Sequence, residues 1–240
     1  MGSYIAYYMT GFLAIPVLIF ALICQGMVKS RYRKYSQVMS RSGMTGADAA
    51  WRLLQLNGIT DVRIQKVAGM LTDNYNPSTK IISLSEGVFD SRSIAAIGIA
   101  CHEAGHACQH AQGYSPLSLR NAAIPVTKIG SGLGVPLVII GVIIAGYAQH
   151  SDIGYYVALI GLILYSFVAL FQLLTLPVEF NASRRALETI KANNFLVDEE
   201  YSGAKRVLTA AALTYVAALA SSLVTMLRLL IMISGARRRR

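Results

Sequence analysis

Long apolar runs are the feature that most limits what this chain can fold into. An α-helix rises about 1.5 Å per residue, so about 20 apolar residues cross the roughly 30 Å hydrocarbon core of a membrane. With 54% hydrophobic and 14% charged residues and a mean hydropathy of +0.48, the chain is too apolar for an ordinary soluble domain. We therefore predict a mainly α-helical integral membrane protein with about four apolar helices. The runs cover residues 5–28, 124–147, 153–176 and 207–233.

The last apolar run contains Arg228 well inside it. A charged side chain at the centre of a membrane is costly unless it reaches the interface or a partner. This run is therefore either a span with a snorkelling arginine or a partly interfacial segment.

The segment between about Met44 and Gly113 has the mixed composition of a small water-soluble unit. Thr45, with Asp48 three residues later, predicts an N-cap and a helix over 46–57. The remaining pattern predicts, in chain order, a strand over 62–67, a turn over 74–78, a strand over 80–85 and a helix from about Ser91 or Arg92 to Gly113. Together these elements form a small α+β unit with a short sheet.

These patterns divide the chain into five expected segments. They are an N-terminal transmembrane helix (1–28), a water-soluble unit (29–120), a transmembrane hairpin (121–176), a helical segment (177–206), and a C-terminal apolar helix with a basic tail (207–240). Cys24, Cys101 and Cys108 are too few and too scattered for a disulfide framework, and we expect them to be buried small hydrophobes.

The positive charge of the chain, +10 in all, lies mostly beside the apolar runs. That distribution favours contact with anionic lipid headgroups and argues against a nucleic-acid partner. Because basic residues prefer the cytoplasmic side, we expect the N-terminus outside and residues 29–130 and 178–206 on the cytoplasmic side of the membrane. With four spans Arg237–Arg240 would lie outside. Either the last segment does not cross, or the rule is broken there.

The segment His102-Glu103-Ala104-Gly105-His106 carries the strongest chemical signal. Residues four apart on a helix share one face, so His102 and His106 can offer two imidazole nitrogens to one metal ion. Glu103 lies beside the first ligand, where its carboxylate can reach a zinc-activated water without itself binding the metal. The motif predicts one Zn²⁺ per chain, with Glu103 as the general base of a hydrolase.

A catalytic zinc ion usually takes three protein ligands, so the sequence must supply one more donor. His110 continues the four-residue spacing, but on an unbroken helix it lies about 12 Å along the axis from His102, too far for one ion. Gln109 and Gln112 stand where a glycine turn and a returning histidine would be needed. We therefore favour Glu179 as the third ligand and expect His110 to support the site or to lie at the surface.

Glu179 follows Pro177, a residue that suits the first position of a new helix after the third span. On such a helix Glu179 and Ser183 share a face that can pack against the histidine helix. Ser183 is then placed to hydrogen-bond a ligand histidine, and Asn181 and His110 are further candidates for that supporting role. Spacing selects no residue to stabilise the oxyanion of the reaction. The candidates are His110, Tyr114, Arg184 and Arg185.

The chain resembles the neutral zinc metallopeptidases of the YugP type, found in bacterial membranes, and more distantly the gluzincin proteases of the HtpX and Ste24 type. The resemblance covers essentially the whole chain and rests on four segments: Asn74-Tyr75-Asn76-Pro77, Ile81-Ile82-Ser83-Leu84-Ser85, Ala100 to Ala107, and Glu179-Phe180-Asn181-Ala182-Ser183. It implies that Glu179 is the third zinc ligand. It also implies that Ile81, Ile82, Ser83, Leu84 and Ser85 form an edge strand that pairs with an extended substrate. Ser183 stands where many gluzincins carry Asp.

These observations favour a membrane-embedded zinc-dependent endopeptidase that acts on peptides or membrane proteins. The alternative is a non-catalytic membrane scaffold in which zinc ties helices together. A closed structural site normally uses four protein ligands, often cysteines, and none of the cysteines is spaced for such a cage. The substrate, any accessory partner and the oligomeric state stay open at this point.

Overall fold

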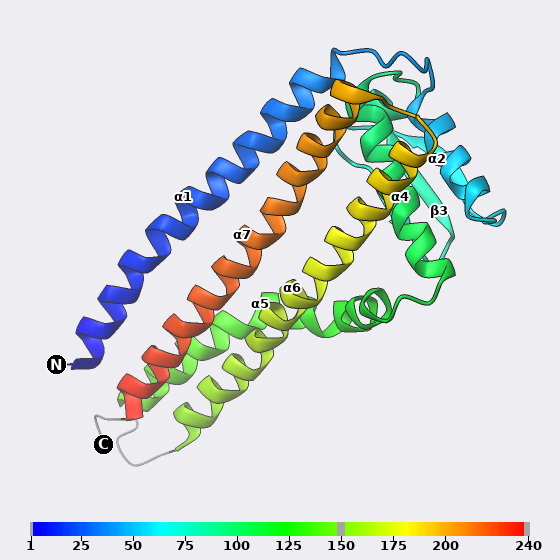
Figure 1. Cartoon of the computed structure of the whole chain (residues 1–240). Helices are drawn as coiled ribbons and strands as arrows, with labels where there is room; N and C mark the ends of the chain where they lie inside the picture. The colour runs from blue at the N-terminus through cyan, green and yellow to red at the C-terminus, as the bar shows by residue number, and fades with distance from the viewer. Residues whose placement is uncertain (1, 148–151, 238–240) are drawn as a thin grey trace. The chain divides into compact units, whose positions relative to one another are not determined.

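The computed structural model describes residues 2–147 and 152–237 and is mainly helical (Figure 1). The expected link between the two hairpin helices falls largely on 148–151, and the last three arginines are 238–240; both lie outside the described residues. In chain order the elements are α1 (Gly2–Ser36), α2 (Gly46–Leu56), β1 (Arg63–Val67), β2 (Asn74–Asn76), β3 (Ile81–Ser85), α3 (Glu86–Phe89), α4 (Ile94–Ala111), α5 (Ser115–Tyr147), α6 (Ile153–Ala192) and α7 (Asp198–Arg237).

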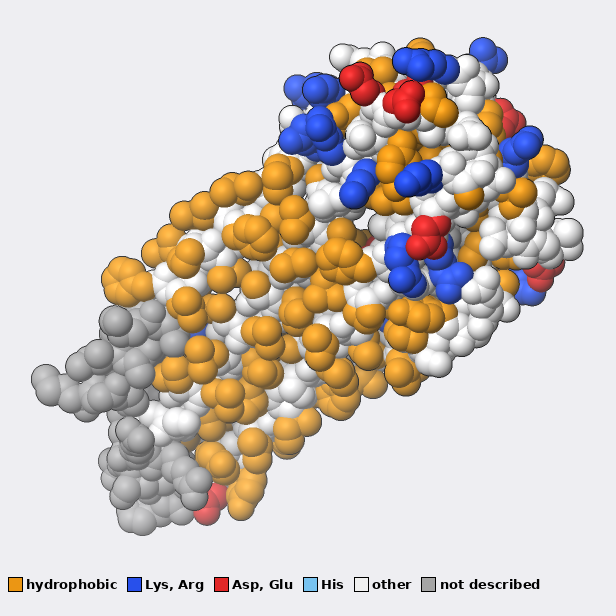
Figure 2. All heavy atoms as spheres, viewed as in Figure 1, with side chains coloured by type: hydrophobic (Ala, Val, Ile, Leu, Met, Phe, Trp, Pro, Cys, Tyr) orange, Lys and Arg blue, Asp and Glu red, His pale blue; other side chains and the backbone are white. Residues whose placement is uncertain are grey.

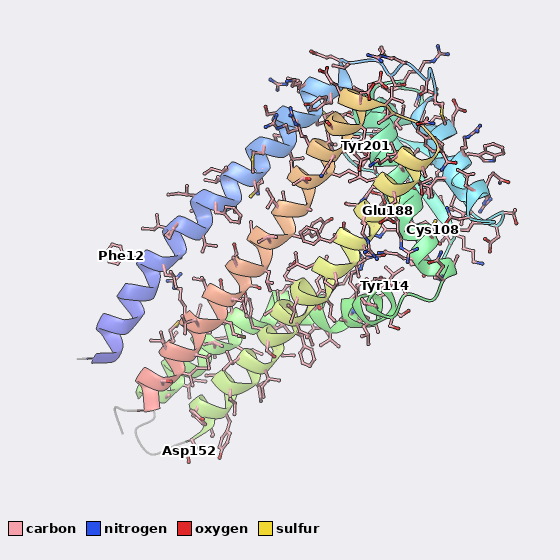
Figure 3. All side chains as sticks on the ribbon, viewed as in Figure 1. Phe12, Cys108, Tyr114, Asp152, Glu188 and Tyr201 are labelled. Carbon is pink, nitrogen blue, oxygen red and sulfur yellow. The ribbon has the colours of Figure 1, made fainter. Side chains whose placement is uncertain are left out.

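Four of the described helices are long and apolar enough to cross a membrane, as the sequence predicts. The candidate spans lie in Gly11–Ser36, Ser115–Gly146, Ile153–Ala192 and Asp198–Gly235. Their side chains are mostly exposed, and Phe12 on α1 projects from its helix with 68% of its surface open (Figure 3). Large exposed apolar surface on every span is what a lipid environment requires.

The chain forms two compact units. A helical unit contains Met1–Ile23, Leu119–Thr175 and Tyr215–Arg240, and an α/β unit contains Cys24–Ser118 and Leu176–Thr214. On the face that Figure 2 shows, the side chains of the helical unit are almost all hydrophobic, whereas Lys, Arg, Asp and Glu side chains gather over the α/β unit. Each unit thus has the surface that its expected solvent, lipid or water, favours.

Glycines bring α5 and α6 together inside the helical unit. A Cβ atom added to Gly161 would lie 2.7 Å from the carbonyl oxygen of Gly134, and one added to Gly134 would lie 2.9 Å from the Cβ of Tyr165. Small residues at such crossings let helix backbones approach closely, which is how helices associate where lipid replaces water. Gly134 of α5 and Gly161 of α6 therefore serve packing, and α5 continues through its glycines and through Pro125 and Pro136.

The α/β unit is built around α4, against which α2 packs (Figure 1). The predicted cap of α2 is confirmed, because Thr45 Oγ1 accepts from the Asp48 backbone and the Asp48 carboxylate accepts from the Thr45 backbone. The core of the unit is apolar, and Cys101 and Cys108 are buried there as free thiols, while Cys24 is also free and buried. Fully buried members of this core are Leu53, Leu54, Ile82, Leu84 and Ile97.

The predicted position of the substrate strand at a sheet edge is wrong. The sheet has the order β1-β3-β2, so β3 (Ile81–Ser85) lies in the centre. It pairs in parallel with β1 along its whole length and antiparallel with β2 from Ile81 to Ser83. The reason is that Asn74–Asn76, which we expected to be part of a turn, forms strand β2. The chain turns at 77–80 and continues as β3, so β2 pairs with β3 on the side that would otherwise be an edge. The outer edges of the sheet therefore belong to β1 and β2.

Two expected helix boundaries are also wrong. Pro177 does not begin a new helix, because α6 runs without interruption from Ile153 to Ala192 with Pro177 inside it. An interior proline removes one backbone hydrogen bond, a loss that membrane helices tolerate when neighbouring groups compensate. The chain then turns after Ala192, and the last helix begins at Asp198, before the apolar run itself.

Candidate metal centre

The motif helix α4 is fixed at its start by a side-chain cap and is buried along most of its length. Ser93 Oγ accepts a hydrogen bond from the Ala96 backbone (3.2 Å), which satisfies one of the free N–H groups of the first turn. His102 and His106 follow on the same face, with ring centroids 4.7 Å apart. The side chain of His106 is buried, whereas that of His102 keeps 14% of its surface open. The one-turn spacing therefore presents both rings to the same point.

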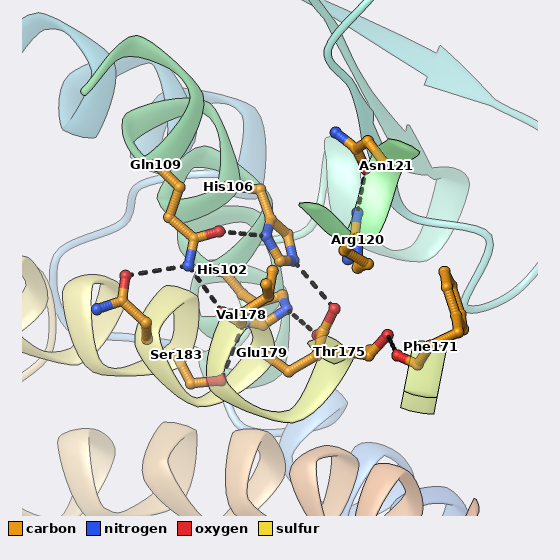
Figure 4. A network of polar contacts seen from close by, with 11 residues as sticks. His102, His106, Gln109, Arg120, Asn121, Phe171, Thr175, Val178, Glu179 and Ser183 are labelled. Atoms are coloured by element: carbon orange, nitrogen blue, oxygen red, sulfur yellow. Dashed lines mark hydrogen bonds and ion pairs between the residues drawn. The ribbon is translucent and has the colours of Figure 1, made fainter. Parts of the chain in front are cut away.

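Glu179 on α6 completes a cluster with the two histidines (Figure 4). Glu179 Oε2 lies 3.2 Å from His102 Nε2, and Glu179 Oε1 lies 3.6 Å from His106 Nε2. One donor atom from each residue lies within 4.8 Å of the other two. The carboxylate thus faces the Nε2 atoms of both rings, which is where a shared cation would be held.

Gly105 allows the two helices that carry these ligands to cross closely. A Cβ atom at this position would lie 2.7 Å from the carbonyl oxygen of Ala182 on α6, a separation that real Cβ atoms essentially never show. The glycine inside the motif therefore has a packing function that the sequence pattern alone did not indicate. It places Glu179 within reach of the two histidines.

Both histidine rings are held through Nδ1 by residues one turn away from a ligand. Ser183 Oγ lies 3.0 Å from His102 Nδ1, and Gln109 Oε1 lies 2.9 Å from His106 Nδ1. Such contacts orient metal-binding rings and favour coordination through the opposite nitrogen. Ser183 was a sequence candidate for this role, whereas Gln109 was not. The available signal was its position three residues after His106, on the same face of α4.

The carboxylate of Glu103 lies in a buried environment beside the cluster. Burial raises the pKa of the Glu103 carboxyl, and the neighbouring His102 and His106 rings oppose that rise. Burial also works against protonation of His106, but the hydrogen bond with Glu179 and the charge of Glu103 outweigh it and raise the pKa of this imidazole. A buried carboxylate next to a ligand cluster, with its pKa raised above the ordinary value, is a stronger base than an exposed one and is suited to accept a proton.

Comparison with known proteins identifies the family of the chain. Residues 10–234 match the family described as "Putative neutral zinc metallopeptidase". The chain belongs to this family. A curated relative, "Putative membrane protease YugP" of Bacillus subtilis (strain 168), is 46% identical over 217 residues, which cover 90% of this chain and 93% of the relative. No solved structure matches the chain.

The residues present fit the zinc that the metallopeptidase family implies. Two imidazoles and one carboxylate form the donor set of known catalytic zinc sites, and three protein donors leave a position for water or substrate. In this structure Ser183 and Gln109 contact the two Nδ1 atoms, while both Nε2 atoms face the carboxylate of Glu179. The Nε2 side of each ring therefore faces the common point at which a metal would be held.

The other candidate residues lie further from the candidate metal centre. Asn181 Oδ1 accepts from Gln109 Nε2 (3.0 Å) and from Arg185 Nε (2.7 Å), so its described hydrogen bonds support Gln109 and not a ligand histidine directly. His110 is exposed, and its Nδ1 lies 2.8 Å from the hydroxyl of Tyr75 on β2.

The structure also shows the contacts of three of the candidates for stabilising the oxyanion. Arg185 Nη1 donates to Gln112 Oε1 (2.6 Å), so this arginine belongs to the network around Asn181. Arg184 is exposed and lies 3.9 Å from Glu188 one turn later. Tyr114 follows the end of α4, where its backbone N–H donates to the carbonyl of Gln109 (2.9 Å). Nothing in these contacts selects one of them for the oxyanion, which stays unassigned.

Proposed function

We propose that this chain is an integral-membrane, zinc-dependent endopeptidase. The observation that carries the proposal is the convergence of His102, His106 and Glu179 within 4.8 Å beside the buried carboxylate of Glu103. His102, His106 and Glu179 would hold one zinc ion, and the substrate would be a peptide or a membrane protein. Membership in the metallopeptidase family supports both statements.

A zinc ion in this position would polarise a peptide carbonyl and lower the pKa of a water molecule toward neutrality. Glu103 accepts the proton of the attacking water. The protonated Glu103 then delivers this proton to the amine nitrogen as the peptide bond breaks, so that the carboxylate is restored for the next cycle. The burial that raises the pKa of Glu103 favours the first of these steps, because it makes the carboxylate a stronger base toward the attacking water.

The ligand set favours catalysis over a purely structural role for the metal. Within the described residues the cluster has three members, whereas a closed structural site normally has four protein ligands. The partly open side chain of His102 indicates the side from which water can reach the site. A scaffold would need neither this opening nor a buried carboxylate beside the ligands.

We further propose that the site faces the cytoplasm in the plasma membrane of a bacterium. Basic residues at the end of α1 and near the start of α7 support this orientation. They include Lys29, Arg31, Arg33, Lys34, Lys205 and Arg206. The same residues would lie near anionic headgroups of the inner leaflet.

The decisive experiment compares Glu103→Gln with Glu188→Gln in purified full-length protein. Glu103→Gln should bind one zinc per chain but cleave a peptide library at least about 100-fold more slowly, because it lacks the proton acceptor. Glu188 is exposed on α6, so Glu188→Gln should cleave like the wild type. His102→Ala should lose zinc and activity together. Unchanged cleavage by Glu103→Gln would refute the mechanism, and a wild-type protein without zinc would refute the whole assignment.

A further inference from the structure

Gln109 is the fully buried polar side chain of the motif helix, and its amide makes three hydrogen bonds. Its Nε2 donates to the backbone carbonyl of Val178 (2.7 Å) and to Asn181 Oδ1 (3.0 Å), both on α6. Its Oε1 faces His106 Nδ1 at 2.9 Å (Figure 4). Both donor hydrogens of the amide are thus used across the helix crossing, and the oxygen is left for the histidine.

The partners of Gln109 fix which way its amide points. The carbonyl of Val178 can only accept, and Asn181 Oδ1 is held as an acceptor because Arg185 Nε donates to it (2.7 Å). An inverted amide would turn its oxygen toward these two acceptor oxygens and lose both hydrogen bonds, at a cost in this buried place. Gln109 therefore presents oxygen to His106, and His106 Nδ1 must carry the hydrogen of that contact.

This contact distinguishes His106 from His102. The hydroxyl of Ser183 can either donate or accept, so its contact with His102 Nδ1 is compatible with both tautomers of that ring. The oxygen of Gln109 can only accept. Of the two contacts, the one from Gln109 thus dictates by itself which nitrogen of a ligand is free for a metal.

We propose that Gln109 is a positioning residue that sets the tautomer of His106, so that the Nε2 lone pair of this ring is directed at the zinc ion. The proposal rests on the proposed function for the identity of the metal, but not on peptide cleavage. The chain Arg185–Asn181–Gln109–His106 is then a single hydrogen-bonded path from the surface of α6 to a ligand. Its role is to lower the cost of presenting His106 in the form that binds zinc.

A purely structural role for Gln109, as a tie between α4 and α6, makes different predictions. Gln109→Met keeps the approximate volume but removes all three hydrogen bonds. Gln109→Glu removes the two donors but keeps an acceptor facing His106. If the amide only ties the helices, Glu is at least as harmful as Met, because its carboxylate opposes the oxygens of Val178 and Asn181. If the acceptor positions His106, Glu retains more zinc affinity than Met.

Zinc affinity of the purified full-length protein, measured by competition with a chelator, provides the first test. We expect Gln109→Met to weaken binding about 10- to 100-fold, the range found when groups that orient a ligand are removed. Gln109→Glu should lie between Met and the wild type. Gln55→Met is the matched control, since Gln55 is an exposed helical glutamine on α2, outside the path from Arg185 to His106, and its affinity should stay within about 2-fold of the wild type.

The second test reads the tautomer directly and needs no substitution at Gln109. The chain has four histidines, so ¹⁵N-histidine spectra of the zinc-bound protein can be assigned with single histidine variants. His106 should show a proton on Nδ1 and zinc on Nε2. Zinc on Nδ1 of His106 overturns the proposal even if every Gln109 variant fails to fold. So does Gln109→Met with wild-type affinity, or Glu binding no better than Met.

These results separate the proposal from the proposed function. The Glu103→Gln protein, which should not cleave peptides, should still bind zinc through His106 Nε2. If the wild type binds zinc in this way but cleaves no peptide, the role of Gln109 stands and the peptidase assignment fails. If the wild type cleaves peptides and Gln109→Met binds zinc normally, the peptidase assignment stands and only the role of Gln109 fails.

Discussion

Gly105→Ala tests whether the close crossing of α4 and α6 is what assembles the metal centre. The added methyl group would lie 2.7 Å from the carbonyl oxygen of Ala182, whereas ordinary contact begins at 3.4 Å. The helices would have to separate by the difference, about 0.7 Å, against backbone atoms that cannot rotate away. Functional constellations tolerate shifts of only about 0.5 Å, so the ligands of the two helices would no longer converge.

The cost of this shift can be stated as zinc affinity. Overpacking a buried site costs about 1–3 kcal/mol. Zinc binding would require the helices to return to their original separation, so the binding free energy would become less favourable by this amount. That corresponds to about 5- to 150-fold weaker binding. Peptide cleavage should fall by at least the same factor, because a misplacement of about 1 Å can cost about 100-fold in rate.

The assay is chelator competition for zinc, followed by cleavage of a peptide library at saturating zinc. Gly132→Ala is the matched control, because Gly132 also lies within a helix but a Cβ there meets no atom within 4 Å. It reports the gain in helix propensity, up to about 1 kcal/mol, that any Gly→Ala exchange in a helix brings. Wild-type zinc affinity and cleavage in Gly105→Ala would refute the reasoning, since the crossing would then tolerate the methyl group.

Three further predictions follow from individual contacts. Ser183→Ala removes the hydroxyl 3.0 Å from His102 Nδ1 and should weaken zinc binding about 10-fold in the chelator assay; an unchanged dissociation constant would contradict the contact's role. Burial raises the pKa of Asp73 above its ordinary value, although hydrogen bonds from Ser85 oppose the rise, so the folded state favours the protonated form. The contribution of protonated Asp73 to the free energy of unfolding is complete below the pKa of Asp73 in the unfolded chain, near 4, and is lost as pH rises through the pKa of Asp73 in the folded protein. The stability of Asp73→Asn relative to wild type, measured by thermal unfolding with chelator present, should therefore grow with pH over that window, and a flat difference would refute the burial argument. Finally, Ser78→Cys in the exposed turn after β2 should react with a membrane-impermeant maleimide in inverted vesicles but not in intact cells, since the three native cysteines are buried; the opposite pattern would place the α/β unit outside.

Much of the fold could be predicted because its signals are local. Apolar length identified the four candidate spans, since no other structure satisfies the backbone of so long an apolar segment in lipid. The pair Thr45 and Asp48 identified the start of α2, because a capping box needs only residues three apart. His102 and His106 identified the face of α4 that carries the donors for the same reason. Each of these inferences depends on spacing within one helix.

The errors arose where the outcome depends on contacts between distant segments. The pattern Ile81–Ser85 indicated a strand, but only the pairing with both β1 and β2 places it at the centre of the sheet. Pro177 suggested a helix start, yet the helix continues, because the local penalty of one proline is smaller than the gain of a long membrane helix. Gln109 carries no recognisable pattern, and its role depends on Val178 and Asn181, about 70 residues later.

The two helices of the candidate metal centre hold each other's ligands. His102 on α4 is oriented by Ser183 of α6, and the residue that orients His106, Gln109, is itself fastened to Val178 and Asn181 of α6. The crossing of the helices and the orientation of the rings are therefore one constraint, and Gly105 is the position that permits it. A change that separates α4 from α6 should weaken zinc binding through both histidines at once. It follows that effects of Gly105→Ala and Gln109→Met on zinc affinity should not add in the double variant, because each removes the same alignment of the two helices.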